Sequence, residues 1–423
     1  MHRSLADWLD LQLNGHSQVI ELGLERVAQV WAKLWPHAIL AQVITVAGTN
    51  GKGSTVAMLE AILRAGHYHV GVYTSPHLFS YNERIKIDGE LIDDDALCQL
   101  FTEIEQARGN IALTYFEYGT LAALLYFVQQ RVDVMVLEVG LGGRLDAVNI
   151  IDADMAIISS IDIDHRAYLG DNREAIGFEK AGIMRPGGLA VYGDRYPVQS
   201  VVEQAQNLSA HLNVFARDFD YSEEEHCWNW RGPARCIQGL PKPALRGRCQ
   251  FNNAAQVIMA LEMLAEYLPV NDDALRQGLT EVKLPGRMQI VSMGALEYVF
   301  DVAHNQQAVK ELAVNIAGLA VKDKTWAICG MLADKCIQST VEALKDRVDY
   351  WLFTGLKEAR SFTTQQLREQ VENLAFDLNY QIMEQSDGAV RHIKSAARAG
   401  ERVLVFGSFY TVAEVYPQVC MKE

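Results

Sequence analysis

The sequence has no long apolar run and is short of basic residues. Within its 423 residues, no apolar stretch approaches the roughly 18 residues that a membrane-spanning helix needs. The 38 Lys and Arg residues against 53 Asp and Glu residues give a formal net charge of −15, which disfavours nucleic acid and anionic membranes as partners. A phosphate or carboxylate ligand must therefore be held by local cations, backbone N–H groups or a metal.

The sequence also lacks closely spaced cysteines. No two of them form the Cys-x-x-Cys pair of many metal and redox sites, so we expect reduced and mostly buried thiols. The N-terminal segment carries Asp7 and Asp10 where a signal peptide would be apolar, and we expect a cytoplasmic protein. The seven cysteines are Cys98, Cys227, Cys236, Cys249, Cys329, Cys336 and Cys420.

The chain is longer than one hydrophobic core usually organises, so two domains are expected. Short Val- and Ile-rich runs alternate with helical patterns, which is typical of parallel sheets with crossover helices. The helical pattern stops at Leu284–Arg287, and a new strand-helix alternation follows. We therefore predict an α/β protein with a mostly parallel N-terminal sheet domain (residues 1–287) and a smaller C-terminal α/β domain (residues 288–423).

The individual elements follow from the same patterns. Residues 218–250 are irregular and predict a small antiparallel excursion followed by a loop. The predicted strands are Val43–Ala47, Val70–Thr74, Val132–Val139, Met155–Ile161, Tyr298–Val302, Trp326–Cys329, Tyr350–Phe353 and Val403–Phe406. The predicted helices are Ser54–Arg64, Asp94–Ala107, Tyr118–Gln130, Asn253–Tyr267 and Asp272–Leu279.

A glycine-rich loop, Gly48–Thr55, joins the first predicted strand to a helix. That order of elements aims backbone N–H groups, a helix N-terminus and one lysine at a single anion, which predicts a nucleotide triphosphate site. Lys52 would reach the outer phosphates, and Ser54 or Thr55 could supply a hydroxyl to Mg²⁺.

Two other interpretations of the glycines are weaker. The loop is a variant, because Val46 stands where the standard phosphate loop has glycine, and a glycine-rich turn can also exist without a ligand. The second glycine cluster, Gly140–Leu145, lacks the third glycine of the dinucleotide fingerprint, which disfavours a dinucleotide oxidoreductase.

Further motifs occur in a fixed order along almost the whole chain. With the phosphate loop, they make the sequence resemble the Mur ligase superfamily and, within it, the dihydrofolate synthase/folylpolyglutamate synthase family. These motifs are Ile20–Val27, Thr74–Leu78, Asn82–Ile85, Leu113–Thr120, Glu138–Asn149, Asp164–His165, Glu179–Ile183, Asn253–Ala255, Pro285–Arg287, Asp301–Asn305 and Gly407–Val412.

The resemblance implies an N-terminal P-loop ATPase domain, a C-terminal Rossmann-like domain and a monomer. It implies that a pterin-linked carboxylate attacks the γ-phosphate of ATP and that L-glutamate takes the resulting acyl phosphate. The implied substrates are ATP, L-glutamate, dihydropteroate and tetrahydrofolates. The alternatives are a folylpolyglutamate synthase without activity on dihydropteroate, and a nucleotide switch without ligase chemistry, against which no plausible Asp-x-x-Gly switch motif is present.

The metal site is predicted partly from the sequence and partly from the resemblance. Glu138 ends a predicted parallel strand near the phosphate loop, where a carboxylate suits Mg²⁺. The resemblance implies two Mg²⁺ ions bound through Ser75, Glu138 and His165. It also implies that CO₂ converts Lys180 to a carbamate that ligates the second ion. Without the resemblance, Lys180 would ordinarily be a solvated or ion-paired helical lysine, and His165 a polar loop residue.

The resemblance assigns the remaining site residues. We expect Lys52, Lys180 and His304 to be catalytic, and Arg84, His304 and Ser408 to receive the incoming glutamate. The expected ATP contacts are Thr49, Asn50, Gly51, Lys52, Gly53, Ser54, Asn253, Arg287 and Asp301.

Three short segments are expected to bind the pterin substrate. Tyr115 and Phe116 could pack on its flat rings, although core packing is the usual role of such a pair, and Glu117 and Asp146 could bind ring nitrogens. This type of motif resembles the enzymes that accept dihydropteroate. The residues are Ile20, Glu21, Leu22, Gly23, Thr114, Tyr115, Phe116, Glu117, Leu145, Asp146 and Ala147.

Overall fold

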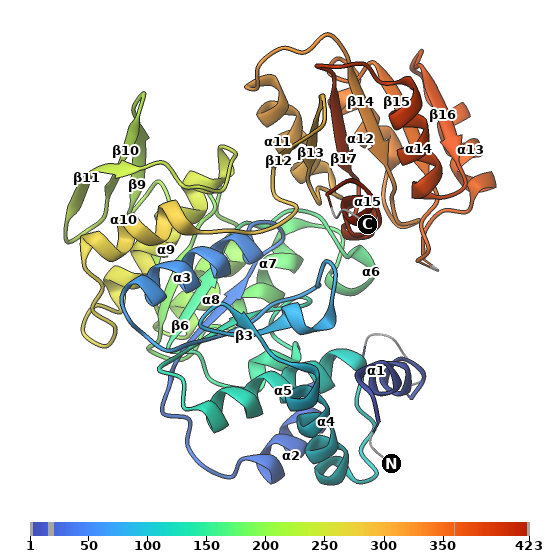
Figure 1. Ribbon diagram of the computed structural model, residues 1–423. Coiled ribbons are helices and arrows are strands. Elements are labelled where there is room, and N and C mark those ends of the chain that lie inside the picture. The colour runs from blue at the N-terminus through green and yellow to red at the C-terminus, as the bar shows by residue number, and fades with distance from the viewer. Residues whose placement is uncertain (1–2, 16–20, 359, 421–423) are drawn as a thin grey trace. The chain divides into compact units, whose positions relative to one another are not determined.

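A computed structural model describes residues 3–15, 21–358 and 360–420 of the chain. The chain forms two compact units, which are described separately (Figure 1). The first contains the residues up to Ala244 together with Gln250–Lys283, and the second contains Leu245–Cys249 together with the residues from Leu284 onward. The division of functional domains at residues 287 and 288 stays a prediction.

The first unit is built on an eight-stranded sheet in the order β4-β3-β2-β5-β1-β6-β7-β8. The strands from β2 to β8 in this order are parallel, whereas β3 and β4 are antiparallel additions at one edge. The central strands are buried almost throughout, as expected for a parallel sheet that helices cover on both faces. The strands are β1 Gln42–Ala47, β2 Val70–Tyr73, β3 Ile85–Ile87, β4 Glu90–Leu91, β5 Val134–Glu138, β6 Met155–Ile158, β7 Leu189–Tyr192 and β8 His211–Val214.

Helices connect and cover these strands. Helix α5 is buried along most of its length, and α1, α2 and α4 pack around it (Figure 1). Helix α10 approaches α3 at Gly278, where an added Cβ would lie 2.5 Å from the Cα of Ile62. The helices are α1 Leu5–Asn14, α2 Glu25–Leu34, α3 Lys52–Ala65, α4 Asp94–Arg108, α5 Tyr115–Gln130, α6 Arg166–Leu169, α7 Arg173–Ala181, α8 Gln199–Asn207, α9 Cys249–Met263 and α10 Asp272–Glu281, with short 3₁₀ turns η1 Tyr81–Arg84 and η2 Ala147–Ile150.

A three-stranded antiparallel sheet completes the first unit, which confirms the predicted excursion. It consists of β9 Asp220–Glu223, β10 Cys227–Arg231 and β11 Cys236–Pro241. Trp228 and Trp230 of β10 are buried, and the Trp230 indole donates to the carbonyl oxygen of Ala255 in α9 at 3.1 Å. The end of the predicted loop is wrong, because α9 already begins at Cys249.

The second unit has a six-stranded sheet in the order β12-β13-β17-β14-β15-β16. All neighbours are parallel except β12 and β13. The two units together confirm the predicted α/β class. The strands are β12 Gln289–Met293, β13 Leu296–Phe300, β14 Thr325–Cys329, β15 Tyr350–Thr354, β16 Tyr380–Met383 and β17 Arg402–Phe406, and the helices are α11 Gln306–Ala317, α12 Ile337–Leu344, α13 Thr364–Glu372, α14 Ser386–Ala396 and α15 Phe409–Cys420.

Two findings bear on the composition. In the part of the chain that the structure describes, no helix is both long and apolar enough to cross a membrane. All seven cysteines are unpaired, as predicted, but only Cys98 and Cys329 are buried, so the expectation of mostly buried thiols is wrong. Four of the other cysteines lie in strands or helices that have a solvent-facing side.

Candidate active site

The phosphate loop of the first unit connects β1 to α3. Gly51 is the N-cap residue of α3 and has φ of 89°, a left-handed conformation that favours glycine. No side chain of the described residues caps this helix, so its first N–H groups need another acceptor. The N-terminus of α3 is therefore suited to bind an anion such as a phosphate.

The neighbouring loop after β6 braces the phosphate loop. An added Cβ at Gly48 would lie 1.9 Å from the Ser159 hydroxyl oxygen, so only glycine fits there. The Ser159 hydroxyl donates to the Asn50 carbonyl oxygen at 2.7 Å, and the Thr49 N–H donates to the Ser160 carbonyl oxygen at 2.6 Å. These serines were not predicted as site residues, because the strand predicted over Met155–Ile161 included them; β6 ends at Ile158, so they lie just beyond its carboxyl end, beside that of β1.

Helix α9 supports the loop from another side. The Gln256 amide donates to the Thr55 hydroxyl at 2.7 Å, and that hydroxyl donates to the Gly51 carbonyl oxygen at 2.9 Å. The Asn253 side-chain oxygen would lie 2.7 Å from a Cβ added at Gly51, which places this predicted ATP contact against the loop. Because Thr55 is engaged in this way, Ser54 is the better candidate for a hydroxyl ligand of Mg²⁺.

Two lysines converge on one oxygen of the loop. The Lys52 ammonium donates to the Gly48 carbonyl oxygen at 3.0 Å, and the Lys180 ammonium, from α7, donates to the same oxygen at 2.9 Å. Lys180 is buried, and burial together with the charge of Lys52 lowers the pKa of its amine to about 7, against the opposing effects of Asp164 and Asp146. Two predicted catalytic residues are thus brought together.

The predicted metal ligands lie at the carboxyl edge of the same sheet. Glu138 is the last residue of β5, and its carboxylate accepts a hydrogen bond from the Ser75 N–H, just beyond β2, at 3.3 Å. His165 is the residue before α6, and the neighbouring Arg166 pairs with Asp171. The described residues contain no group of three or more His, Cys, Asp or Glu side chains that could hold a metal ion.

This donor set fits a magnesium ion that is held mainly by its substrate. Mg²⁺ usually keeps several waters and binds through one or two carboxylates together with phosphate oxygens. The buried Glu138 carboxylate and the adjacent Ser75 supply oxygen ligands of that kind. Lys180 in its ammonium form offers no ligand, so its predicted role requires the carbamate.

The three segments predicted for the pterin are also brought together. The Gly23 N–H donates to the Leu145 carbonyl oxygen at 3.3 Å, which joins the first segment to the third. The Arg26 guanidinium pairs with Glu21 and, at 2.9 Å, with Glu117, which joins the first segment to the second. Ile20 lies outside the described residues.

The two carboxylates of these segments, those of Glu117 and Asp146, accept hydrogen bonds from backbone N–H groups. Glu117 and Thr114 form a capping box at the start of α5, in which Glu117 accepts from the Thr114 N–H at 2.7 Å. Asp146 accepts from the N–H groups of Leu141 and Val148 at 2.7 and 3.1 Å. Asp146 is buried, and burial raises the pKa of its carboxyl to about 6.

Arg84 lies at the carboxyl end of β2, beside the predicted metal ligands. Its carbonyl oxygen accepts from the Thr74 N–H at 2.9 Å, one residue before Ser75. Its Nε donates to Nδ1 of His77 at 2.9 Å. Burial and the Arg84 charge lower the pKa of His77 to about 4, so the imidazole is neutral and can accept this bond.

The second unit holds the other predicted residues. Asp301 accepts from the N–H groups of Met288 and Ala303 at 2.9 and 2.8 Å, and burial raises the pKa of its carboxyl against the effect of Arg287. The Phe409 ring lies 5.0 Å from the Arg287 guanidinium and 6.1 Å from the His304 ring.

Two further contacts orient side chains in this unit. Nδ1 of His304 bonds to the Val302 carbonyl oxygen at 2.8 Å, which requires a proton on Nδ1. The Ser408 hydroxyl accepts from the Thr411 N–H at 3.0 Å near the start of α15, so it also has a structural role.

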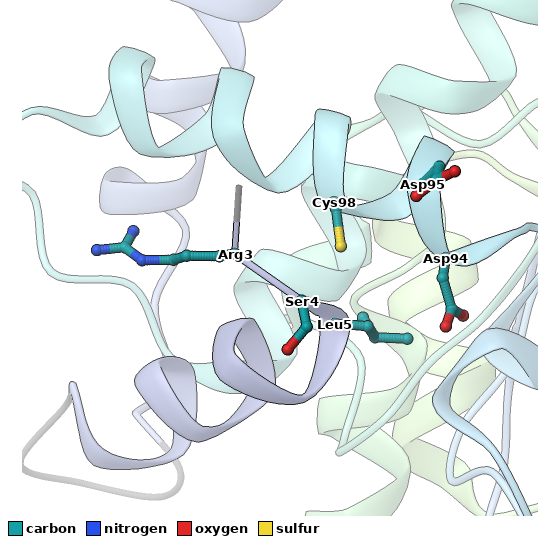
Figure 2. Close-up of a pocket in the computed structure, with 6 residues that line it drawn as sticks. All are labelled: Arg3, Ser4, Leu5, Asp94, Asp95 and Cys98. Carbon is teal, nitrogen blue, oxygen red and sulfur yellow. The ribbon is translucent and has the colours of Figure 1, made fainter. Parts of the chain in front are cut away.

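A surface groove of about 450 Å³ lies elsewhere, between the start of α1 and the start of α4 (Figure 2). Burial and the neighbouring Asp94 and Asp95 raise the pKa of its Cys98 thiol, which disfavours a reactive thiolate. None of the predicted site residues lines this groove, and we assign it no role. Its lining residues are Arg3, Ser4, Leu5, Asp94, Asp95 and Cys98.

Comparisons with known proteins agree with this geometry. The Mur ligase middle domain matches residues 46–225, and the Mur ligase glutamate ligase domain matches residues 286–409. The chain is 44% identical over 412 residues to the dihydrofolate synthase/folylpolyglutamate synthase of Escherichia coli, covering 97% of this chain and 94% of that protein.

Solved structures show the same likeness. The Escherichia coli FolC protein in complex with DHPP and ADP has a TM-score of 0.91 at 42% identity, covering 98% of this chain and 97% of that chain. A bifunctional folylpolyglutamate synthase/dihydrofolate synthase with Mn, AMPPNP and L-glutamate bound has a TM-score of 0.89 at 42% identity, with 98% of each chain covered.

Proposed function

Because the chain belongs to the dihydrofolate synthase/folylpolyglutamate synthase family of Mur ligases, we propose that it is an ATP-dependent ligase with both activities. It joins L-glutamate to dihydropteroate, which forms dihydrofolate, and to tetrahydrofolates, which lengthens their glutamate chain. Its substrates are small molecules.

One observation in the first unit carries this proposal. The phosphate loop and the Ser75–Glu138 pair are at the carboxyl ends of adjacent parallel strands, the edge where ligands bind in open α/β sheets. The three pterin segments are tied to one another in the same unit. A nucleoside triphosphate and a carboxylate substrate can therefore both bind to the first unit.

The phosphate-binding residues act by position and charge. In the first unit, the N–H groups at the start of α3 and the Lys52 ammonium hold the phosphates. The second unit carries a cation of its own, Arg287. Ser54, Ser75, Glu138, His165 and carbamylated Lys180 would hold two Mg²⁺ ions. Bound Mg²⁺ neutralises charge on the phosphates and on the phosphoryl group in transfer.

The chemistry proceeds in two balanced steps. An oxygen of the substrate carboxylate attacks the γ-phosphorus of ATP, and the bond to ADP breaks. The glutamate amine then attacks the acyl carbon, inorganic phosphate leaves, and the amine loses a proton. In the second unit, His304, with its proton fixed on Nδ1, would contact glutamate or accept its proton, and Ser408 is a further candidate contact. In the first unit, Arg84 is the candidate for a substrate carboxylate.

The cellular setting is part of the proposal. Seven unpaired cysteines are typical of a reducing compartment, so we place the enzyme in the cytoplasm. The acidic composition supports the absence of nucleic acid partners. The family resemblance favours a monomer.

Phosphate release tests the proposal directly. It should be measured with dihydropteroate and with tetrahydrofolate, each in the presence and absence of L-glutamate. Strict dependence on both the carboxylate substrate and glutamate supports the ligase. Activity with tetrahydrofolate alone indicates a folylpolyglutamate synthase, and turnover without glutamate indicates a nucleotide switch.

A further inference from the structure

Arg84 is a buried cation without a carboxylate partner among the described residues. Only 8% of the residue is exposed. The described chain contains no ion pair between its guanidinium and any Asp or Glu. The titratable groups around it are Tyr73, which shares a hydrogen bond with it, Tyr81, Tyr115 and the neutral His77. Burying a charge without an opposite charge lowers the stability of the fold. Such groups are found mainly at functional sites, where a bound ligand supplies the opposite charge.

Two tyrosine rings hold this guanidinium in place. The Arg84 guanidinium carbon lies 5.2 Å from the ring centre of Tyr81 and 5.3 Å from that of Tyr115. The two rings are 5.3 Å apart and nearly perpendicular, at 84°. Arg84 thus lies against an aromatic corner, defined here as the rings of Tyr81 and Tyr115, which attracts a cation without neutralising its charge.

The hydroxyl group of Tyr81 forms no hydrogen bond in the described chain, so the contact that Tyr81 makes with Arg84 is through its ring. Tyr81 is 3% exposed, and its hydroxyl oxygen has no hydrogen-bond partner among the described residues. Helix α5 leaves room for it through Gly119, where an added Cβ would lie 2.5 Å from that oxygen. A buried hydroxyl without a partner costs free energy, which indicates that the ring is kept for another contact.

We propose that Tyr81 and Tyr115 are positioning residues whose rings hold Arg84 for a substrate carboxylate, which supplies the negative partner that the protein lacks. This inference rests on the proposed function. It gives Tyr115 a second role besides the pterin contact predicted for it. The Arg84 carbonyl oxygen accepts from the N–H of Thr74, the neighbour of Ser75, so the ligand would be a carboxylate near the proposed metal ligands.

Three variants of the full chain separate this role from simple core packing. Tyr81→Leu removes a ring face, Tyr81→Phe keeps it, and Phe101→Leu is the matched control. Phe101 is buried and its ring centre lies 6.0 Å from that of Tyr81, but no contact of Phe101 with Arg84 is present in the described chain. The Michaelis constants for ATP, L-glutamate and tetrahydrofolate should be measured, together with binding of the last two by titration calorimetry.

Tyr81→Leu should raise the KM and Kd of one carboxylate substrate about tenfold, the scale of one desolvated cation–π contact, and change the KM for ATP less than twofold. A change for L-glutamate identifies the amine donor as the Arg84 ligand, and a change for tetrahydrofolate identifies the acceptor. Tyr81→Phe should restore wild-type constants, and Phe101→Leu should keep them. If Tyr81→Leu does not fold, Tyr81→Met, which also removes the ring face but keeps a large apolar side chain, should give the same pattern.

Unchanged constants in a folded Tyr81→Leu protein would overturn the proposal. So would equal effects in Phe101→Leu, or equal losses for all three substrates. Failure of the proposed function looks different, because wild-type protein would then release phosphate without needing glutamate. Binding measured by titration calorimetry does not depend on turnover, so it tests the positioning role of the tyrosines even if the proposed function is wrong.

Discussion

Lys52 and Lys180 donate to the same acceptor, the carbonyl oxygen of Gly48. Neither ammonium has a carboxylate ion pair in the described chain, and the two charges raise each other's energy. The buried Lys180 responds with a pKa of about 7, so near neutrality much of it is the uncharged amine. The uncharged amine is the form that reacts with CO₂, which supports a carbamate at this position.

Replacing Lys180 should abolish activity without unfolding the protein. Lys180→Ala removes the proposed carbamate, and Lys180→Arg keeps a positive charge and cannot form one, so both should be nearly inactive. Acetate or formate should partly restore Lys180→Ala by filling the vacated ligand position. Phosphate release with and without these anions is the measurement. Wild-type turnover by Lys180→Arg would exclude the carbamate.

Lys52→Ala should lose at least about a hundredfold in rate, the effect typical of one preorganised electrostatic group. Lys52 is half-buried at the first residue of α3, so thermal unfolding should change little. Lys33→Ala is the matched control, because Lys33, in α2, also donates to a backbone carbonyl oxygen, that of Ala107, and not to the phosphate loop. Near-normal phosphate release by folded Lys52→Ala would contradict the assignment of the phosphate loop.

Gly51→Ala should weaken ATP binding more than it weakens the fold. An added Cβ would be strained at φ of 89° and would lie 2.7 Å from the Asn253 side-chain oxygen. Gly187→Ala is the control, because Gly187 has φ of 67° but nothing lies within 4 Å of its added Cβ. Both variants should lose about 1 kcal/mol of stability from backbone strain. Only Gly51→Ala should raise the KM for ATP, by more than about tenfold; equal KM values would show that the contact is unimportant.

The Asp146 carboxyl should make stability depend on pH. Burial raises its folded pKa from 3.8 to about 6, so between these values the folded state binds more protons than the unfolded state. Wild-type stability therefore falls as pH rises from about 4 to 6, by at most about 3 kcal/mol from this group.

Asp146→Asn lacks this titration. The difference in unfolding free energy between Asp146→Asn and wild type should shift towards the variant as pH rises from 4 to 7. Urea unfolding at several pH values measures this shift. Any stability that Asp146→Asn loses with the hydrogen bond from the Leu141 N–H is the same at every pH and does not alter the shift. A difference independent of pH would show that Asp146 titrates normally.

Dihydropteroate should be a substrate as well as tetrahydrofolate. The basis is the segment Thr114–Glu117, which resembles the motif of enzymes with both activities, and its connection to Glu21 through Arg26. Formation of dihydrofolate from dihydropteroate, ATP and glutamate can be followed by chromatography. Activity confined to tetrahydrofolate or its polyglutamates would favour the monofunctional alternative.

The sequence predicted the central strands and the phosphate loop because both depend on neighbouring residues. Continuous apolar runs mark β1 and β5, and the glycine-lysine spacing is local. Six short strands that lie at a sheet edge or next to one were missed: β3, β4, β7, β8, β12 and β16. Runs of two to five residues carry too little periodicity to identify a strand. The start of α5 was predicted three residues late, although Thr114 and Glu117 form a capping signature that the sequence displays.

For the same reason, the sequence indicated individual site residues but not the contacts between them. Family motifs indicated Arg84 and Tyr115 separately, but nothing in the sequence shows that Tyr81, 34 positions before Tyr115, completes their contact. The shared oxygen of Lys52 and Lys180 likewise depends on the packing of α7 against the loop. Such contacts come from tertiary structure and not from spacing.

The assignment of Leu245–Cys249 to the second unit limits how these proteins can be recombined. The Arg248 N–H donates to the Asn315 side chain at 3.3 Å, and the residues on both sides of the segment belong to the first unit. A chimera spliced once at Lys283 would pair this segment with a foreign α11. Exchanging the second unit between relatives therefore requires transplanting the five residues Leu245–Cys249 as well, which lie within the sequence of the first unit.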